Sequence, residues 1–166
     1  MASSVGRHEM VRQYAWAIPN TEAVAAIADL SPIVEVGAGG GYWTMLIRHA
    51  GGHVAPFDAQ PYPLLNRYIG RAWAPVSKGG VARAMKAGRE AWTLMLCWPP
   101  YWSPMAEHAL RLHRGDHVVY IGEGEGGCTA TDAFHEQLAA HYEQVGRIQL
   151  PQWPGLHDDL EIWERL

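Results

Sequence analysis

A glycine-rich stretch with an acid on either side could bind a nucleotide-like cofactor. Glu35 precedes glycines at positions 37, 39, 40 and 41, and Asp58 lies 21 residues beyond Gly37. Glycines let the backbone turn tightly and approach a ligand closely. An acid about 20 residues after such a loop, at the end of the next strand, is placed to hydrogen-bond the hydroxyls of a ribose. A lone glycine loop can also be a turn that binds nothing, so the acid at the matching distance is a second, independent indication of a cofactor site.

The residues around this loop predict a strand before it and a helix after it. Ile33 to Val36 is a short β-branched run typical of a buried parallel strand. Residues 42–50 favour a helix, which Gly51 and Gly52 end with a left-handed cap. A second strand, His53 to Phe57, then brings Asp58 to its carboxyl end. The loop and the acid are therefore expected to lie at the same edge of a parallel sheet.

Strand and helix patterns alternate along the rest of the chain. Two helices are expected between His8 and Leu30, separated before Asn20 by Pro19. Further strands are expected at residues 73–77, 92–98, 117–121, 147–150 and 159–164, with helices at 81–89, 103–115 and 131–142. The inner face of the helix at 103–115 should carry Met105, Ala109 and Leu112. Gln60 to Ile69 is Pro-rich and predicts an irregular segment.

This pattern predicts an α/β fold, a three-layer sandwich around a mostly parallel seven-stranded sheet. The last two strands alternate apolar and polar residues, which is typical of an antiparallel hairpin at a sheet edge. At 166 residues the chain has a single-domain length. We expect one domain, with residues 1–31 as an N-terminal helical cap and residues 32–166 as the cofactor-binding core.

Charge argues against a nucleic-acid partner. The formal net charge is −4, and an acidic surface binds polyphosphate poorly. The segment from Leu65 to Glu90 holds six basic residues and one acid, a charge of +5, so the remainder carries −9. These basic residues are Arg67, Arg71, Lys78, Arg83, Lys86 and Arg89. Because few aromatic residues are interleaved with them, we interpret the segment as a solvated helix face.

The sequence predicts neither a membrane segment nor a metal site. Met1 to Met10 is polar and lacks the apolar core of a signal peptide, and no run approaches the ~20 apolar residues that span a bilayer. We therefore expect a cytoplasmic protein. The nine His and two Cys show no metal-ligand spacing, so we expect no metal, and Cys97 and Cys128 are expected to be reduced thiols.

The spacing of the glycines separates two classes of cofactor. A dinucleotide-binding loop reads Gly-x-Gly-x-x-Gly, but the third glycine position counted from Gly37 is Tyr42. The pattern is instead Glu35-x-Gly37-x-Gly39-x-Gly41. It resembles the loop of the Rossmann-like (class I) S-adenosylmethionine-dependent methyltransferase family, and the resemblance extends from about Ile33 to Leu166. It implies the strand order 3-2-1-4-5-7-6 and S-adenosylmethionine as the cofactor.

The resemblance also implies which residues bind the cofactor. The glycine loop should pass under its amino-acid and sugar portions, and Asp58 should bind the ribose hydroxyls. Aromatic faces can stabilise the sulfonium cation. The candidate cofactor-binding residues are Tyr14, Trp16, Glu35, Gly37, Ala38, Gly39, Gly41, Trp43, Asp58, Ala59, Cys97 and Trp98.

A Trp98-Pro99-Pro100-Tyr101 sequence ends the fourth strand. It is similar to the Asp/Asn-Pro-Pro-Tyr motif of amino-group methyltransferases, in which the first and last residues hold the target amine. Trp98 lacks the side-chain acceptor of that motif, so a small molecule is the expected acceptor rather than a nucleic-acid base. Two prolines can also simply end a strand. The candidate catalytic residues are Tyr101 and, as bases in or just after the loop that follows the fifth strand, Glu123 and His135, with Glu125 as a further candidate.

These observations favour a methyltransferase that acts on a small molecule. Three alternatives stay open: a cofactor-binding accessory protein without methyl transfer, an enzyme that cyclises or lyses S-adenosylmethionine, and, last, a nicotinamide-dependent oxidoreductase. The frame uses nearly the whole chain and leaves no separate substrate domain. The pocket must therefore be covered by residues 14–20, by residues 60–80, or by a second copy of the chain in a homodimer.

Overall fold

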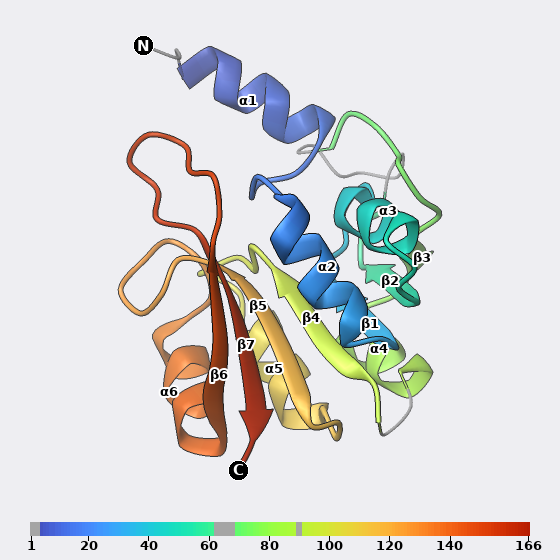
Figure 1. Ribbon diagram of the computed structural model, residues 1–166, viewed down its shortest axis with the longest axis vertical. Helices are drawn as coiled ribbons and strands as arrows, with labels where there is room; N and C mark the ends of the chain where they lie inside the picture. The colour runs from blue at the N-terminus through green and yellow to red at the C-terminus, as the bar shows by residue number, and fades with distance from the viewer. Residues whose placement is uncertain (1–3, 62–68, 89–90) are drawn as a thin grey trace.

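A single seven-stranded sheet forms the centre of the molecule (Figure 1). The computed structural model describes residues 4–61, 69–88 and 91–166. Its strands are β1 Ile33–Val36, β2 Val54–Asp58, β3 Ser77–Lys78, β4 Thr93–Cys97, β5 His117–Gly122, β6 Tyr142–Gln149 and β7 Asp159–Arg165. The strand order is β3-β2-β1-β4-β5-β7-β6. Only the pairs that involve β7 are antiparallel, which confirms the predicted fold class and strand order.

Helices cover both faces of the sheet. They are α1 Ser4–Gln13, α2 Thr21–Asp29, α3 Tyr42–His49, α4 Val81–Ala87, α5 Met105–Leu112 and α6 Asp132–His141. In Figure 1, α2 and α3 lie in front of the sheet and α4, α5 and α6 behind it, while α1 extends away from the body at the top. No helix in the described part of the chain is long and apolar enough to cross a membrane.

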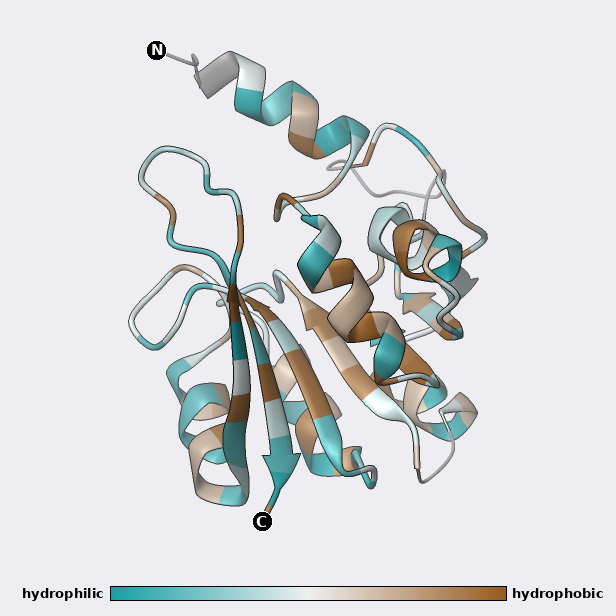
Figure 2. Cartoon of the chain, in the orientation of Figure 1, coloured by the Kyte–Doolittle hydropathy of each residue, from teal (hydrophilic) through white to brown (hydrophobic). Residues whose placement is uncertain are grey.

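The core is divided into two halves by the pleat of the central strands. Val34 and Val36 of β1 pack with the helices behind the sheet, whereas Ile33 packs with α2 and α3 in front of it. Strands β4 and β5 are buried on both faces, and Figure 2 shows hydropathy alternating along β6 and β7 at the sheet edge. The sheet therefore fixes the carboxyl ends of β1, β2 and β4 side by side, where ligands of parallel sheets bind.

Several element boundaries differ from the sequence-based expectations. The third strand is only Ser77–Lys78, because the amide of Trp73 bonds the carbonyl of Gly40 instead of a strand. Strand β6 begins at Tyr142, five residues before the predicted start at Arg147, since its first exposed residues are polar and show no alternation. On α5, Ala109 is buried as predicted, but Leu112 is 37% exposed, so the prediction that Leu112 lies on the inner face is wrong. The predicted irregular segment Gln60 to Ile69 lies mostly outside the described residues.

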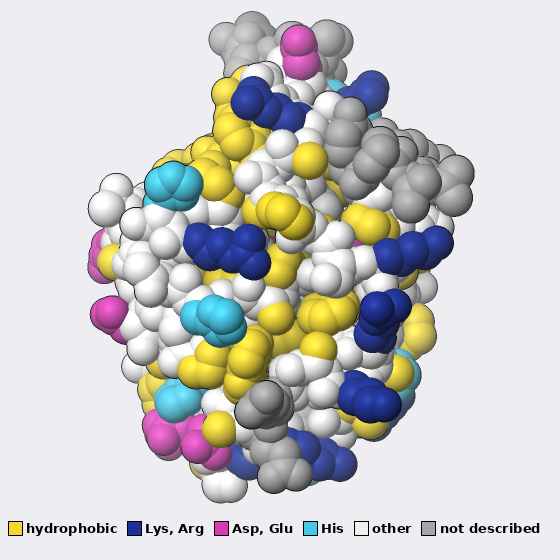
Figure 3. Space-filling view, turned by 90° about the vertical axis from the view of Figure 1, so that its right-hand side faces the viewer, with side chains coloured by type: hydrophobic (Ala, Val, Ile, Leu, Met, Phe, Trp, Pro, Cys, Tyr) yellow, Lys and Arg dark blue, Asp and Glu magenta, His cyan; other side chains and the backbone are white. Residues whose placement is uncertain are grey.

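The basic residues of the 65–90 segment lie on the surface. Arg71, Lys78, Arg83 and Lys86 are exposed, and none of these four forms an ion pair with an acid in the described part of the chain. Figure 3 shows Lys and Arg side chains spread along the face to the right of Figure 1, separated by other surface. This distribution fits the predicted solvated face. Arg67 and Arg89 lie outside the described residues.

A buried histidine should make the fold sensitive to acid. His113 is held between the carbonyl of Trp92, 2.9 Å from Nε2, and the hydroxyl of Tyr142, 3.2 Å from Nδ1. Burial lowers the pKa of His113 from 6.5 to about 4. Between these two pKa values the unfolded chain binds a proton at His113 and the folded chain does not. The contribution of neutral His113 to the free energy of unfolding is therefore complete above pH 6.5 and is lost as the pH falls toward 4.

We expect His113→Gln to remove about 2 kcal/mol of the stability difference between pH 7.5 and pH 5. Urea unfolding at the two pH values, with the exposed His108→Gln as control, measures it. If His113→Gln loses as much stability as the wild type between pH 7.5 and pH 5, His113 is not the source of the acid sensitivity.

Candidate functional site

Backbone hydrogen bonds hold the glycine loop against the end of β2. The amides of Gly37 and Ala38 both donate to the carbonyl of Phe57, at 2.8 and 3.0 Å. Asp58 continues this contact: its Oδ2 accepts from the amide of Gly39 at 2.9 Å, and its Oδ1 accepts from the amide of Gln60 at 2.7 Å. The acid that the spacing singled out thus fixes the loop directly.

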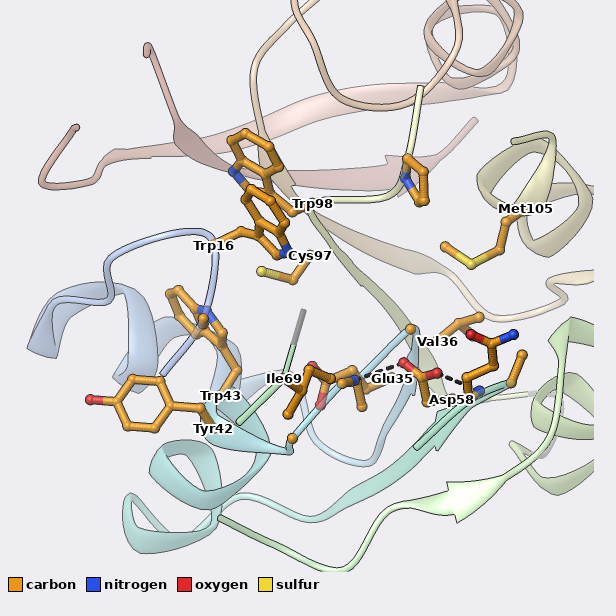
Figure 4. A pocket seen from close by; sticks show the side chains of 18 of the residues that line it. Trp16, Glu35, Val36, Tyr42, Trp43, Asp58, Ile69, Cys97, Trp98 and Met105 are labelled. Carbon is orange, nitrogen blue, oxygen red and sulfur yellow. Dashed lines mark hydrogen bonds between the residues drawn. The ribbon is translucent and has the colours of Figure 1, made fainter. Parts of the chain in front are cut away.

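Positive φ angles at three glycines shape this loop. Gly37, Gly39 and Gly41 have φ values of 80°, 57° and 74°, a region that disfavours side chains. An added Cβ at Gly39 would lie 2.9 Å from Cδ1 of Ile69, whose side chain Figure 4 shows beside the loop. The absence of a side chain at Gly39 therefore lets Ile69 pack directly against the loop backbone.

A cavity of about 550 Å³ opens above this loop (Figure 4). Its volume lies in the range of small-molecule and cofactor sites. Of the twelve residues predicted to bind a cofactor, eleven line it. These are Tyr14, Trp16, Glu35, Gly37, Ala38, Gly39, Trp43, Asp58, Ala59, Cys97 and Trp98. The structure therefore brings together residues that are up to 84 positions apart, from Tyr14 to Trp98.

Gly41 is the predicted residue that does not line the cavity. It caps α3 with a left-handed φ. An added Cβ would lie 3.0 Å from Cβ of Ala74 and 3.2 Å from Cγ2 of Val76. Gly41 thus lets the segment 74–76 pack against the start of the helix, and its predicted contact with the cofactor stays a prediction.

Two segments from the regions expected to cover the pocket are joined to each other beside it. The indole of Trp73 donates to the carbonyl of Gln13 at 2.7 Å, and the amide of Gly70 donates to the carbonyl of Arg12 at 2.7 Å. The ring of Tyr14 stacks on that of Trp73, with centroids 5.3 Å apart. The end of α1 and the segment that begins at Ile69 are therefore joined to each other, and Val11, Tyr14 and Ile69 from these two segments line the cavity.

Glu35 places a buried carboxyl group in the floor of the cavity. Its side chain is 2% exposed and accepts a hydrogen bond from the hydroxyl of Thr44. Burial, with a smaller contribution from the charge of Asp58, raises the pKa of Glu35 to about 7. The carboxyl group is thus close to half-ionised at neutral pH.

A pair of stacked tryptophans forms the end of the cavity away from Asp58 (Figure 4). The rings of Trp16 and Trp98 lie 5.0 Å apart between centroids, with 12° between their planes. Trp98 adopts a left-handed φ of 52°, and its indole donates to Oδ1 of Asp158 at 2.9 Å. The guanidinium carbon of Arg7 lies 5.6 Å from the centre of each ring.

The three residues predicted to be catalytic do not line this cavity. Both carboxylate oxygens of Glu123 accept backbone hydrogen bonds, from Cys128 at 2.8 Å and His157 at 3.0 Å. Although burial raises it, these bonds bring the pKa of Glu123 below its ordinary value, which makes the carboxylate a weaker base. His135 contacts the carbonyl of Thr129 at 3.2 Å. Tyr101 is 56% exposed beside the lining residues Pro100 and Trp102.

Sequence reasoning missed several lining residues. They are Val11, Ala15, Val36, Gly40, Tyr42, Gln60, Ile69, Gly79, Gly80, Val81, Pro100, Trp102, Ser103 and Met105. Gly79 and Gly80 follow β3 at the edge where ligands bind, a position that could have marked them. Met105 begins α5 and carried no such signal. Within the described residues, no group of three or more His, Cys, Asp or Glu side chains could hold a metal ion.

Comparison with solved structures identifies the fold. The N-methyltransferase NodS from Bradyrhizobium japonicum WM9, in complex with S-adenosyl-L-homocysteine, aligns with a TM-score of 0.57 at 15% identity over 96% of this chain and 85% of that chain. Magnesium protoporphyrin IX methyltransferase from Synechocystis PCC 6803, with bound S-adenosylmethionine, aligns with a TM-score of 0.55 at 13% identity, over 98% of this chain and 81% of that chain. An rRNA methylase from Streptococcus thermophilus aligns with a TM-score of 0.52 at 15% identity, over 87% of this chain and 93% of that chain.

These likenesses show that the chain has the Rossmann-like fold of class I S-adenosylmethionine-dependent methyltransferases. The resemblance seen in the sequence is thereby confirmed for the fold. The structures that share it act on different kinds of acceptor, small molecules and RNA among them. No protein-family model matches the sequence, and no curated protein matches it.

Proposed function

We propose that the protein is an S-adenosylmethionine-dependent methyltransferase that acts on a small-molecule acceptor. The observation that carries the proposal is the joint geometry of the glycine loop and Asp58, whose carboxylate is bonded to the loop amide of Gly39 while it lines the same cavity. The solved structures of this fold that hold S-adenosylmethionine or S-adenosylhomocysteine support the same cofactor.

The residues at the cavity fit that cofactor. Gly37, Ala38 and Gly39 line the cavity, and the two glycines present backbone without a side chain to a ligand there. Asp58 offers a carboxylate to a ribose diol, and Glu35 offers a buried carboxyl group to an ammonium group. At the other end Trp16 and Trp98 present aromatic faces, which favour a nearby cation. The cavity is thus acidic at its floor, as a ligand with a diol and an ammonium group requires, and aromatic at its far end, where the acceptor would bind.

When bound, the cofactor would supply an electrophilic methyl group on a sulfonium. The chain's own contribution would be to orient the two reactants and exclude water. The glycine loop and Asp58 hold one end of the cavity, and Tyr14, held by its stacking on Trp73, lines it. The indoles of Trp16 and Trp98 border the acceptor end. The roles predicted for Tyr101, Glu123 and His135 stay predictions, because none of these side chains lines the cavity.

Binding and turnover test the two parts of this proposal separately. We expect calorimetry to show micromolar binding of S-adenosylmethionine and S-adenosylhomocysteine, and no comparable binding of reduced nicotinamide cofactors. Mass spectrometry with a small-molecule acceptor panel should then detect S-adenosylhomocysteine as the product. Methylthioadenosine instead would indicate cyclisation or lysis, and cofactor binding without turnover on any acceptor would favour an accessory protein. Absence of binding of either ligand would end the proposal.

A further inference from the structure

Three buried polar atoms lack a hydrogen-bond partner in the described part of the chain, and two of them, on Arg7 and Asp158, lie at the tryptophan end of the site. They are Nε of Arg7, Nε1 of Trp43 and Oδ2 of Asp158. Trp43 lines the cavity, while Arg7 and Asp158 both contact the ring of Trp98. Because buried polar groups in native proteins are almost always paired, two unpaired atoms at one place indicate a polar ligand there.

The tryptophan pair already holds a cation. The guanidinium of Arg7 lies within cation–π range of both Trp16 and Trp98. Asp158 adds a carboxylate that is 0% exposed on the same indole of Trp98. Two aromatic faces beside a buried carboxylate are the elements of a site for an organic cation.

Arg7 fills this place incompletely. Its positive charge acts on Asp158, yet its Nε and the Oδ2 of Asp158 both lack a hydrogen bond. The internal cation therefore supplies charge without satisfying the carboxylate. An ammonium group, whose N–H bonds can point in three directions, could give Oδ2 the hydrogen bond that the planar guanidinium does not.

We propose that Trp16, Trp98 and Asp158 form a binding subsite for a small organic amine, and that Arg7 of α1 occupies this subsite until the amine displaces it. The inference rests on the proposed function in one respect, namely that the amine is the methyl acceptor. The bound ammonium group would pass one proton to the Asp158 carboxylate; its nitrogen lone pair would then form the N–CH₃ bond as the S–CH₃ bond breaks and S-adenosylhomocysteine leaves. Both indoles line the cavity, so an amine held there would face the interior of the site. Asp158, the residue just before β7, does not itself line the cavity but is bonded to Trp98, which does. Its Oδ1 positions the Trp98 indole, and its Oδ2 would accept a hydrogen bond from the amine once Arg7 is displaced.

Matched ligands of the same shape test the charge requirement. Calorimetric titrations at pH 8 would compare phenethylamine, a cation, with the neutral phenethyl alcohol, in the presence and absence of S-adenosylhomocysteine. We expect the amine to bind at least about tenfold more tightly, since only it can satisfy the carboxylate. Equal affinities would overturn the inference. A lysine-containing peptide forms a parallel arm, and binding of the peptide without the small amine would also overturn it.

Two substitutions assign the preference to the proposed residues. Asp158→Asn keeps an oxygen for the Trp98 indole but removes the charge, so we expect it to abolish the tenfold preference for the amine without changing the affinity for the alcohol. Arg7→Gln removes the internal competitor and should tighten amine binding about fivefold, whereas Arg12→Gln on the same helix should not. An amine preference that survives in Asp158→Asn would contradict the assignment.

The pH dependence supplies a readout that a structural role would not move. Burial raises the pKa of Asp158 to about 6, so amine affinity should fall between pH 8 and pH 5 as the carboxylate takes up a proton. The charged and titratable groups coupled to Asp158 are Arg7, Glu123, Asp159, Cys97, Tyr120 and Cys128. Titration with S-adenosylhomocysteine alone separates the two proposals: if it binds and the amine is not preferred, only the subsite fails, and if it does not bind, the proposed function fails.

Discussion

Asp58→Ala is expected to weaken binding of S-adenosylmethionine by about 100-fold or more. The carboxylate makes two hydrogen bonds to backbone amides, to Gly39 at 2.9 Å and to Gln60 at 2.7 Å. Each hydrogen bond that the ribose hydroxyls would donate to this carboxylate is worth about 1.5–3 kcal/mol, and a loss of about 2.8 kcal/mol is a factor of 100 in affinity. Alanine would therefore remove both the contact proposed for the ribose and the anchor that orients the glycine loop.

Matched variants separate these two contributions. Asp58→Asn keeps an oxygen for the loop amide, so we expect a smaller loss, of about tenfold. Asp29→Ala removes an exposed acid at the end of α2 and should leave affinity unchanged. Calorimetry measures the affinities, and circular dichroism checks that each variant is folded. Wild-type affinity in a folded Asp58→Ala would show that the carboxylate does not serve a cofactor.

The fold could be predicted because its signals are local and repeated. Short β-branched runs followed by glycine turns and capped helices specify strand-then-helix units, and right-handed connections leave few ways to arrange them. The spacing from Gly37 to Asp58 placed the acid beside the glycine loop for the same reason, since one helix and one strand set the distance between them. Boundaries failed where tertiary contacts replaced local preference. Trp73, for example, bonds the glycine loop and leaves the predicted third strand with only its last residue, Ser77.

The chemistry at the tryptophan end could not be predicted in this way. The interaction between Trp98 and Asp158 joins residues 60 positions apart, and neither residue carries a spacing signal that names the other. Glu123 was predicted to be a catalytic base because it is a carboxylate in a glycine-rich loop. Its two oxygens instead accept hydrogen bonds from the backbone amides of Cys128 and His157. Asp58 also accepts two backbone hydrogen bonds, but unlike Glu123 it lines the cavity. Which carboxylate reaches the site depends on contacts brought by the fold, which single-sequence patterns do not contain.

Glu35→Gln is expected to stabilise the protein at pH 8 while it weakens cofactor binding. The raised pKa of Glu35, from 4.5 to about 7, reflects above all its burial. Because the folded chain holds this proton more tightly than the unfolded chain, stability is greatest below pH 4.5 and is lost as the pH rises toward 7. Above that pH the buried anion costs about 3 kcal/mol. Glutamine removes the titration and can still accept the hydrogen bond from Thr44.

Urea unfolding should therefore show Glu35→Gln to be more stable than the wild type by about 3 kcal/mol at pH 8 and about equal to it at pH 4.5. The exposed Glu143→Gln should show no such gain. Affinity for S-adenosylmethionine at pH 8 should fall about tenfold, since the lost charge faces the cofactor's ammonium group in the proposed site. If Glu35→Gln is stabilised at pH 8 but binds S-adenosylmethionine as tightly as the wild type, the charge of Glu35 does not contribute to cofactor binding. Both effects together would indicate that the chain retains an unfavourable buried charge because the cofactor compensates it.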